Sequence, residues 1–164
     1  PTKYKIKGSF GHPVPVVDGK TQSAGAKAKA IVLRKEFTEE RDLFSIDYTS
    51  AYSTPNLDKL IRTFVYDRQG EGNFTVSDEF TANVPIRFET AITTQADWKV
   101  LDDTRLLLTS GTEQMIVNIE ASGKVAFTSE TIEVNASAYT RIGIALKEQA
   151  EKGYIWLKMQ AKQL

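Results

Sequence analysis

The sequence predicts an all-β fold: an antiparallel two-sheet β-sandwich of about a dozen strands, with at most one or two short helical turns. Three observations carry this prediction. First, 12 Ile, 11 Val and 17 Thr make β-branched residues abundant among the 164, and 16 aromatic residues add to the bias toward strands. Second, apolar and polar residues alternate with a period of two in many short segments. Third, turn residues separate these segments at intervals of roughly 8–12 residues, as in sandwiches.

The alternating segments predict strands in chain order, and each ends near a turn signal. Residues 69–73 give the clearest hairpin loop, because Gly70 and Gly72 permit the positive φ angles of a tight reversal. Shorter turn signals lie at 18–19, 102–103, 110–111 and 122–123. The predicted strands are 2–7, 26–33, 44–48, 62–68, 74–78, 84–93, 104–109, 114–120, 124–127, 131–135, 138–146 and 154–159.

Helical signals are few. Leu57, Leu60, Ile61 and Phe64 follow a helical spacing, which predicts one short helical turn leading into the strand at 62–68. Residues 145–152 have good helix propensity, but Gly153 and the neighbouring strands leave an exposed loop and a single turn equally open.

Length and charge exclude several classes of protein. The 164 residues suit one domain, 1–164, large enough to build a core without metal or disulfide bonds. The 21 Lys and Arg balance 21 Asp and Glu, which argues against a general nucleic-acid binder. With no cysteine, disulfides, thiolate metal sites and cysteine nucleophiles are excluded. No apolar stretch is long enough for a membrane span. A chain that begins within an alternating pattern is expected to be part of a longer polypeptide.

His12 is the only histidine, and Gly11 and Pro13 fix the backbone on either side of it. It is a candidate accessory catalytic residue, because an imidazole can steer a carboxylate or carry a proton near neutral pH. One histidine without cysteine cannot form a metal cluster, so no metal site is expected from this chain's own residues. A packed or surface histidine near the start of a strand is the plainer interpretation.

Further candidates are residues suited to acidic sugars. Tyr48, Tyr52, Arg62 and Arg68 are candidate substrate-binding residues, since a guanidinium pairs with a carboxylate or sulfate in two-point geometry. Trp98 is a further candidate, because its ring could stack on a sugar face. Strand packing and surface ion pairs are the plainer interpretation of these residues. No nucleophile elbow or phosphate-binding glycine loop is present, so the residues alone predict no self-contained catalytic apparatus.

The order of several short segments resembles one region of a known enzyme family. Residues 11–22 followed by 25–28, then 47–52, then 62–68 with 75–80, and finally 141–146 are similar to successive motifs in the C-terminal region of heparinase II/III-like polysaccharide lyases. The similarity spans nearly the whole chain in the same order.

That resemblance implies a fold, a reaction and partners. Family enzymes join an N-terminal α/α toroid, which holds most catalytic residues, to β-sheet layers, and they cleave uronic-acid polysaccharides such as heparan sulfate or alginate by β-elimination. This chain would then support the toroid, line one side of the cleft and be inactive alone. In some members a histidine matching His12 reaches the cleft or ligates a structural zinc whose other ligands lie upstream. No cofactor is expected in this chain, and the location is expected to be periplasmic or extracellular.

Two alternatives remain open. The sandwich could be a stand-alone module that binds acidic glycans through Arg62, Arg68, Arg141 or Trp98, or an adhesion domain without a ligand of its own. Sandwiches serve many functions, so the fold alone does not decide.

Overall fold

A computed structural model describes residues 7–134 and 137–162 of the chain. Nearly all of the regular structure is extended, and its helical parts include two single 3-10 turns, η2 (Ser9–Gly11) and η3 (Thr49–Ala51). The strands are β1 (Val16–Val17), β2 (Ile31–Phe37), β3 (Arg41–Asp47), β4 (Leu57–Asp67), β5 (Asn73–Ile86), β6 (Phe88–Thr94), β7 (Asp97–Asp102), β8 (Arg105–Ser110), β9 (Glu113–Ala121), β10 (Val125–Val134), β11 (Ser137–Leu146) and β12 (Ala150–Ala161).

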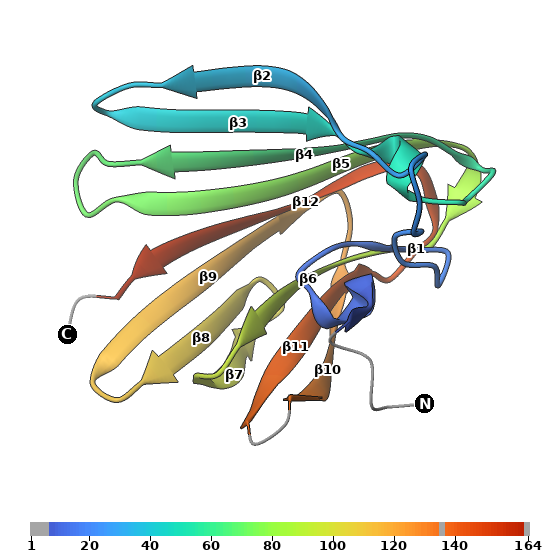
Figure 1. Cartoon of the computed structure of the whole chain (residues 1–164). Coiled ribbons are helices and arrows are strands. Elements are labelled where there is room, and N and C mark those ends of the chain that lie inside the picture. Colours follow the sequence, from blue (N-terminus) through green and yellow to red (C-terminus); the bar gives the residue numbers. More distant parts are fainter. Residues whose placement is uncertain (1–6, 135–136, 163–164) are drawn as a thin grey trace.

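These strands form two antiparallel sheets, shown in Figure 1. The larger has the order β2-β3-β4-β5-β12-β9-β8-β7, and the smaller has the order β1-β6-β11-β10. The predicted two-sheet antiparallel fold with about a dozen strands is therefore confirmed. The hairpin at 69–73 is confirmed as well: it joins β4 to β5, with φ of 61° at Gly70 and 72° at Gly72.

The helical turn predicted from Leu57 to Phe64 is wrong. This segment belongs to β4, which pairs with β5 along its whole length. A register shift between Leu57 and Lys59 places Leu57 and Leu60, three residues apart, among the buried residues of the same strand. The bulge thus produces a helix-like spacing in a strand. The helical turn that does occur, η3, precedes this segment.

The strand predicted at 26–33 begins only at Ile31. Before it, the chain turns at Gly25, which has a φ of 113°, and Ala28 N–H donates to the Gly25 carbonyl at 3.1 Å. Ser50 Oγ then accepts from Lys29 N–H and donates to the Lys29 carbonyl, which holds this backbone away from any sheet.

Other boundaries also differ from expectation. The strands predicted at 124–127 and 131–135 are one strand, β10, while β1 and β7 were not predicted. The segment 147–149 between β11 and β12 is a loop rather than a helical turn. Residues 2–6 and Asn135, which belong to predicted strands, lie outside the described residues, and Lys7 lies in a 3-10 turn.

The core lies where the smaller sheet covers the larger one. Phe80 of β5 stacks on Phe88 of β6 with ring centroids 4.5 Å apart. Gly153 of β12 makes room for this pair, because a Cβ there would lie 2.9 Å from the Phe80 ring and 2.7 Å from Ser122 Oγ. The buried side chains around this stack come from both sheets: Leu60, Ile86, Leu106, Val117, Ile142, Ile144, Ile155 and Leu157.

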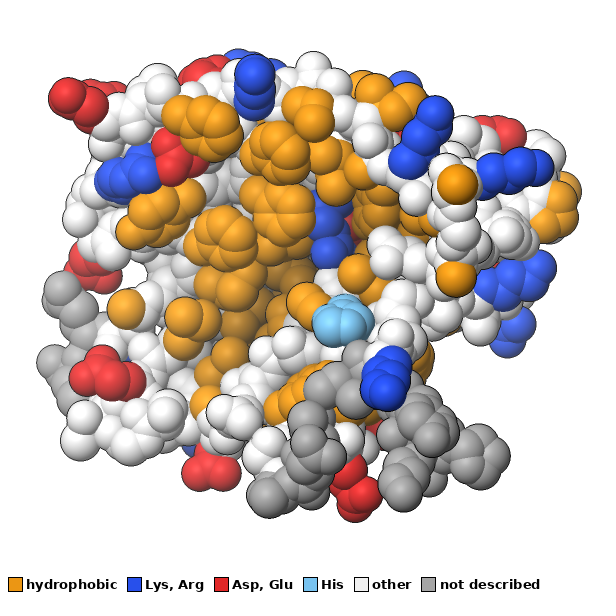
Figure 2. All heavy atoms as spheres, viewed as in Figure 1, with side chains coloured by type: hydrophobic (Ala, Val, Ile, Leu, Met, Phe, Trp, Pro, Cys, Tyr) orange, Lys and Arg blue, Asp and Glu red, His pale blue; other side chains and the backbone are white. Residues whose placement is uncertain are grey.

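Four strands cannot cover eight, so part of the same sheet face is left without a covering layer. Cross-strand pairing places Tyr66 beside Phe74, and Phe37 joins the same row through Asp42 of β3. The exposed fractions are 67% for Phe37, 45% for Tyr66, 37% for Phe74 and 38% for Met115. We call these four residues, with Phe64 between them and the core, the open face. Figure 1 shows the β2–β3 and β4–β5 hairpin tips extending past the smaller sheet, and Figure 2 shows hydrophobic side chains gathered in the hollow beneath.

Candidate functional site

A short segment, Gly11–Pro15, crosses between the two sheets just before β1, and we call it the strap. Pro13 and Pro15 have no backbone N–H, so this segment cannot donate to a strand ladder at those positions. Side chains from both sheets bind its carbonyl groups instead. The donors and acceptors are Tyr139 Oη to Gly11 O, Arg62 Nη1 to Pro13 O at 2.6 Å, Arg141 Nη2 to Val14 O at 3.3 Å and Tyr52 Oη to Pro15 O at 2.8 Å.

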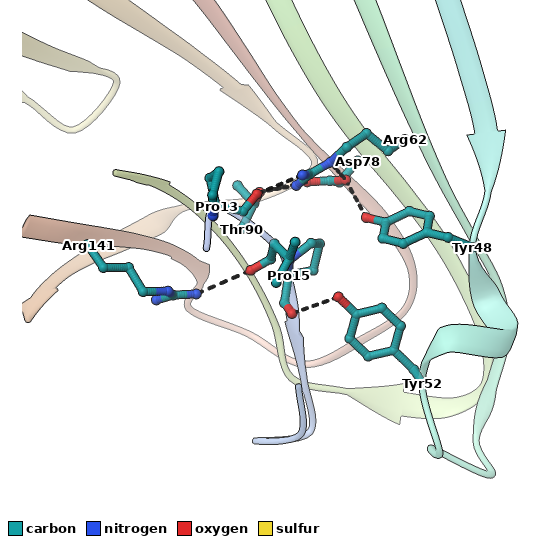
Figure 3. Close-up of polar contacts among 9 residues, drawn as sticks. Pro13, Pro15, Tyr48, Tyr52, Arg62, Asp78, Thr90 and Arg141 are labelled. Atoms are coloured by element: carbon teal, nitrogen blue, oxygen red, sulfur yellow. Dashed lines mark hydrogen bonds and ion pairs between the residues drawn. The ribbon is translucent and has the colours of Figure 1, made fainter. Parts of the chain in front are cut away.

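Asp78 of β5 is the centre of the buried polar network beside the strap, shown in Figure 3. Arg62 of β4 donates to both of its carboxylate oxygens, from Nε and from Nη2, each at 2.7 Å. Tyr48 Oη donates to Oδ1 at 2.7 Å, and Thr90 Oγ1 of β6 donates to Oδ2 at 2.6 Å. Because Thr90 belongs to the smaller sheet, this buried ion pair joins the two sheets.

The surroundings of this network keep Tyr48 and Tyr52 neutral and Arg62 charged. Burial, and secondarily the negative charge of Asp78, raises the pKa of both tyrosines above their ordinary value. Burial alone would lower the pKa of Arg62, but the charge and hydrogen bonds of Asp78 outweigh it and raise that pKa. A buried pair of this kind is costly to break, since either partner alone would be an uncompensated charge.

A second buried guanidinium holds the strap on the side of the smaller sheet. Arg141 of β11 pairs with Glu89 of β6 at 2.6 Å, and its guanidinium carbon lies 4.3 Å from the centre of the Phe10 ring. Gly143 makes this possible, because a Cβ there would lie 2.7 Å from the Glu89 carboxyl carbon and 2.4 Å from Thr128 Oγ1. The resemblance motif at 141–146 therefore includes a glycine that the ion pair requires.

The strap holds His12 in an exposed position. The His12 backbone N–H donates to Ser9 O at 3.0 Å, and its carbonyl accepts from Val14 N–H at 2.8 Å. The residue lines a shallow cavity of about 340 Å³ with Thr93, Thr94, Gln95 and Tyr139. Figure 2 shows the single imidazole, in pale blue, at the edge of the hydrophobic hollow. Its backbone is thus fixed by side chains from both sheets, and its imidazole forms no hydrogen bond or ion pair with the described residues.

The predicted substrate-binding residues fall into two groups. Tyr48, Tyr52 and Arg62 come together beside the strap, but they are buried and their polar groups bind partners within the chain. Trp98 is not with them: it lies on β7, at the other end of the larger sheet from Tyr48, and packs half-buried against the core. No observation here tests a substrate contact for any of the four, and that role stays a prediction.

The remaining predicted arginine, Arg68, lies at the edge of the open face. It pairs with Asp42, donates to Thr38 O at 3.2 Å, and places its guanidinium carbon 4.9 Å from the centre of the Tyr66 ring. Arg68 and Asp42 are both partly exposed, so this ion pair is much weaker than the buried Arg62–Asp78 pair.

Sequence reasoning missed Asp78, the centre of the network, and with it Thr90. A signal was present: Asp78 alternates with Val76 and Phe80 on the inward side of a strand, so it interrupts an apolar row. A carboxylate in that position must be buried and therefore needs a cationic partner. Arg62 interrupts the row of Leu60 and Phe64 in the same way, which makes it the matching partner.

The side chains of the described residues do not form a complete metal site. Within residues 7–134 and 137–162, no three His, Asp or Glu side chains gather in a way that could hold a metal ion. His12 offers one imidazole, so a zinc bound there would need ligands from outside this chain. None of the helical elements in this part of the chain could span a membrane.

Solved structures with the same fold include a heparan sulfate lyase and a heparinase III. A mutant of heparan sulfate lyase HepC from Pedobacter heparinus superposes with a TM-score of 0.73 and 13% identity, over 93% of this chain and 24% of that one. A heparinase III superposes with a TM-score of 0.71 and 17% identity, over 95% of this chain and 24% of that one. No protein-family model matches the sequence, and no curated protein matches it.

The chain thus spans about a quarter of the length of the structures that it matches. At identities of 13% and 17%, the likeness establishes the fold. The chain has the β-sandwich fold of a domain found in heparinase III structures.

Proposed function

We propose that this chain is the β-sandwich domain of a polysaccharide lyase that cleaves uronic-acid polysaccharides by β-elimination. In this proposal residues 1–164 form one domain. The domain supports a helical catalytic domain, an α/α toroid, and lines one side of the substrate cleft. The sequence resemblance favours this function, and so does the fold shared with the heparan sulfate lyase HepC.

The observation that carries the proposal is the open face. Phe37, Tyr66, Phe74 and Met115 form an exposed apolar surface on the inner side of the larger sheet. Exposed apolar patches of this kind mark contact surfaces. The matched chains are about four times longer than this one, so a much larger body is available to cover the patch. We assign the open face to contact with the toroid.

His12 then lies where the cleft would form. β-Elimination requires a group that neutralises the uronate carboxylate, a base for the C5 proton and an acid for the leaving oxygen. Around His12 the cavity offers one imidazole and the hydroxyl group of Thr93, while the Tyr139 hydroxyl already donates to Gly11 O and Thr94 Oγ1 accepts from Ala96 N–H. This set can steer a carboxylate or move one proton. The remaining catalytic groups would come from the toroid, and His12 is proposed as an accessory residue.

The buried residues beside the strap receive a different role in this proposal. Tyr52 and Arg62 hold the strap carbonyls, and Tyr48 holds the Asp78 carboxylate that orients Arg62. They act as positioning residues for His12. We propose no resident metal for this chain, and a periplasmic or extracellular location, where such polysaccharides occur.

Two assays test this function. The 164-residue chain and the longer polypeptide encoded with it are each incubated with heparan sulfate, alginate and hyaluronan, and the ultraviolet absorbance of the unsaturated product is followed. We expect no turnover by the chain alone, and turnover of at least one substrate by the longer protein. In the latter, His12→Ala should lower kcat, while Lys27→Gln, a change of an exposed residue in the loop before β2, should not. Turnover by the 164 residues alone would contradict the proposal that the catalytic groups lie mainly on the toroid.

A further inference from the structure

The outer surface of the larger sheet, which faces away from the smaller sheet, carries a pair of aromatic rings. Tyr154 and Trp156 are two residues apart on β12, so both side chains point to this surface. Their ring centroids are 5.2 Å apart with planes inclined by 45°. Trp156 is 38% exposed although β12 is an internal strand, between β5 and β9. A large ring is therefore open to solvent in the middle of a sheet.

Glu120 of β9 is the cross-strand partner of Trp156 on one side and accepts a hydrogen bond of 3.4 Å from Tyr154 Oη. On the other side, small side chains leave the Trp156 ring accessible. Its cross-strand neighbour on β5 is Ser77, and the next residue in that row, on β4, is Thr63. Thr63 forms a hydrogen bond of 2.9 Å with Ser45 of β3, so the hydroxyl groups lie low on the sheet. The result is a flat polar strip beside an exposed aromatic pair.

Two shallow cavities flank the aromatic pair, and each contains two cationic side chains. One, of about 510 Å³, is lined by Tyr154 with Lys59 and Lys152. The other, of about 600 Å³, is lined by Trp156 with Arg105 and Lys158.

Carboxylates reduce but do not cancel this positive charge. Glu79 lines the first cavity and Glu120 the second, and Arg105 pairs with Asp102 at 2.6 Å. Among the described residues, the three lysines have no carboxylate within ion-pair distance. Three ammonium groups therefore remain available to an anionic ligand.

We propose that this surface, defined by Tyr154, Trp156, Lys59, Lys152 and Lys158, binds an acidic polysaccharide chain. Sugar rings would stack their C–H faces on the two aromatic rings. Their carboxylate or sulfate groups would lie against the ammonium groups in the flanking cavities. Along β12, Lys152 and Lys158 lie at the two ends of the aromatic pair, which suits a ligand whose charged groups lie on either side of its apolar faces.

This site lies on the opposite side of the sheet from His12 and the open face. Its ligand class is the one that the proposed lyase would cleave, but the site needs no toroid and no catalysis. It also replaces Trp98 and Arg62, which are half-buried and buried, as the place where the chain itself could hold a glycan. A single-stranded nucleic acid also offers rings and charges, but the fold shared with a heparan sulfate lyase favours the polysaccharide.

Affinity electrophoresis of the 164-residue chain tests the proposal. Heparan sulfate, alginate or hyaluronan is cast in the gel, with neutral dextran and a single-stranded oligonucleotide as competing ligand classes. We expect retardation by at least one acidic polysaccharide, none by dextran, and a loss of retardation as salt is raised. Trp156→Ala should weaken binding about tenfold or more, within the range for losing one stacked ring. Lys152→Gln with Lys158→Gln should weaken it about as much and flatten the salt dependence.

Matched controls change the same residue types elsewhere. Lys27→Gln with Lys29→Gln removes two exposed charges from the loop before β2, and Phe37→Ala removes an exposed ring from the open face; both should stay within about twofold of the unaltered chain. In a Trp98→Phe variant Trp156 is the only tryptophan, and its fluorescence should change on titration with the glycan. The proposal is overturned if the chain binds no acidic glycan, or if Trp156→Ala binds the glycan as well as the unaltered chain does. It is also overturned if the chain binds dextran or the oligonucleotide as well as it binds the acidic glycan. None of these results bears on turnover by the longer protein, so the two proposals fail separately.

Discussion

Two halves of the inner face of one sheet have very different surroundings. Near Leu60, Phe80 and Ile155, the larger sheet is covered by β6 and β11 and the side chains are buried. Near Phe37, Tyr66 and Phe74, the same strands continue with the same alternation, but these side chains are exposed. The pattern of the sequence is the same in both halves. Only the presence of a second layer distinguishes the core of this chain from a surface suited to a partner.

The Arg62–Asp78 network marks the boundary between the two halves. The Arg62 guanidinium carbon lies 5.9 Å from the centre of the Phe64 ring on its open side, while Thr90 of the smaller sheet binds Asp78 on its covered side. The strap crosses at the same place. At this boundary, the same side chains hold the two sheets together and fix the position of His12.

Loss of the Asp78 carboxylate, at the centre of the network, should lower the stability of the chain more than any other change considered. Asp78→Ala leaves Arg62 buried without its partner, so we expect a loss of about 3–5 kcal/mol in the free energy of unfolding. Asp42→Ala removes the carboxylate from a partly exposed pair and should cost much less, because solvent screens that pair. Urea unfolding measures both. Equal losses would mean that the buried network does not hold the sheets together.

A pair of apolar substitutions compares the two halves directly. Ile144→Ala, in the covered core, should lower the free energy of unfolding by about 3 kcal/mol through the cavity that it leaves. Phe37→Ala, on the open face, should change it by about 0.5 kcal/mol or less, because the ring is already in water. A large loss for Phe37→Ala in thermal or urea unfolding would show that the open face is covered in the isolated chain.

Alkaline pH should weaken the boundary. The folded chain holds the protons of Tyr48 and Tyr52 above the ordinary tyrosine pKa of about 10, whereas the unfolded chain releases them there. The folded state then binds more protons, so stability should be complete below about pH 10 and fall as pH rises above it. Urea midpoints between pH 8 and 11 measure this, and Tyr48→Phe should make the decline shallower. If a variant that carries both Tyr48→Phe and Tyr52→Phe loses stability with rising pH as the unaltered chain does, these two tyrosines are not the cause of the loss.

The smallest effect concerns His12. Tyr139→Phe removes one hydrogen bond to the strap, at Gly11 O, and should cost about 1 kcal/mol of stability. A positioning role also predicts a change that stability alone would not produce: the His12 ring resonances should shift and broaden in NMR spectra. Tyr66→Phe, which alters a tyrosine of the open face, should leave them unchanged. An unaltered His12 spectrum in Tyr139→Phe would mean that Tyr139 does not position His12.

The sequence was enough to predict the fold class, the hairpin at 69–73 and most strands, because alternation and turn chemistry are local properties. It failed at 57–64, where a bulge in β4 imitates helical spacing, and at 26–30, where Ser50 holds the backbone in a loop. Neither the bulge nor that tertiary contact leaves a clear local signal.

The candidate site was predicted only in part for a similar reason. Tyr48, Tyr52 and Arg62 were identified as chemically suited residues, but their burial depends on which strand faces they occupy after the sheets pair. Asp78 was missed, although its place in an apolar row made it the natural partner of Arg62. The exposure of Trp156 depends on the small neighbours Ser77 and Thr63 on other strands, which only the sheet register brings beside it.

Carbene footprinting is the most direct test of the open face as a contact surface. Phe37, Tyr66, Phe74 and Met115 are labelled in the 164-residue chain and in the longer protein, with Trp156 on the outer surface as an internal reference. We predict strong labelling of the four residues in the chain alone and a decrease of about fivefold or more in the longer protein, with Trp156 labelled equally in both. Equal labelling of the four in both proteins would contradict the assignment of the open face to the catalytic partner.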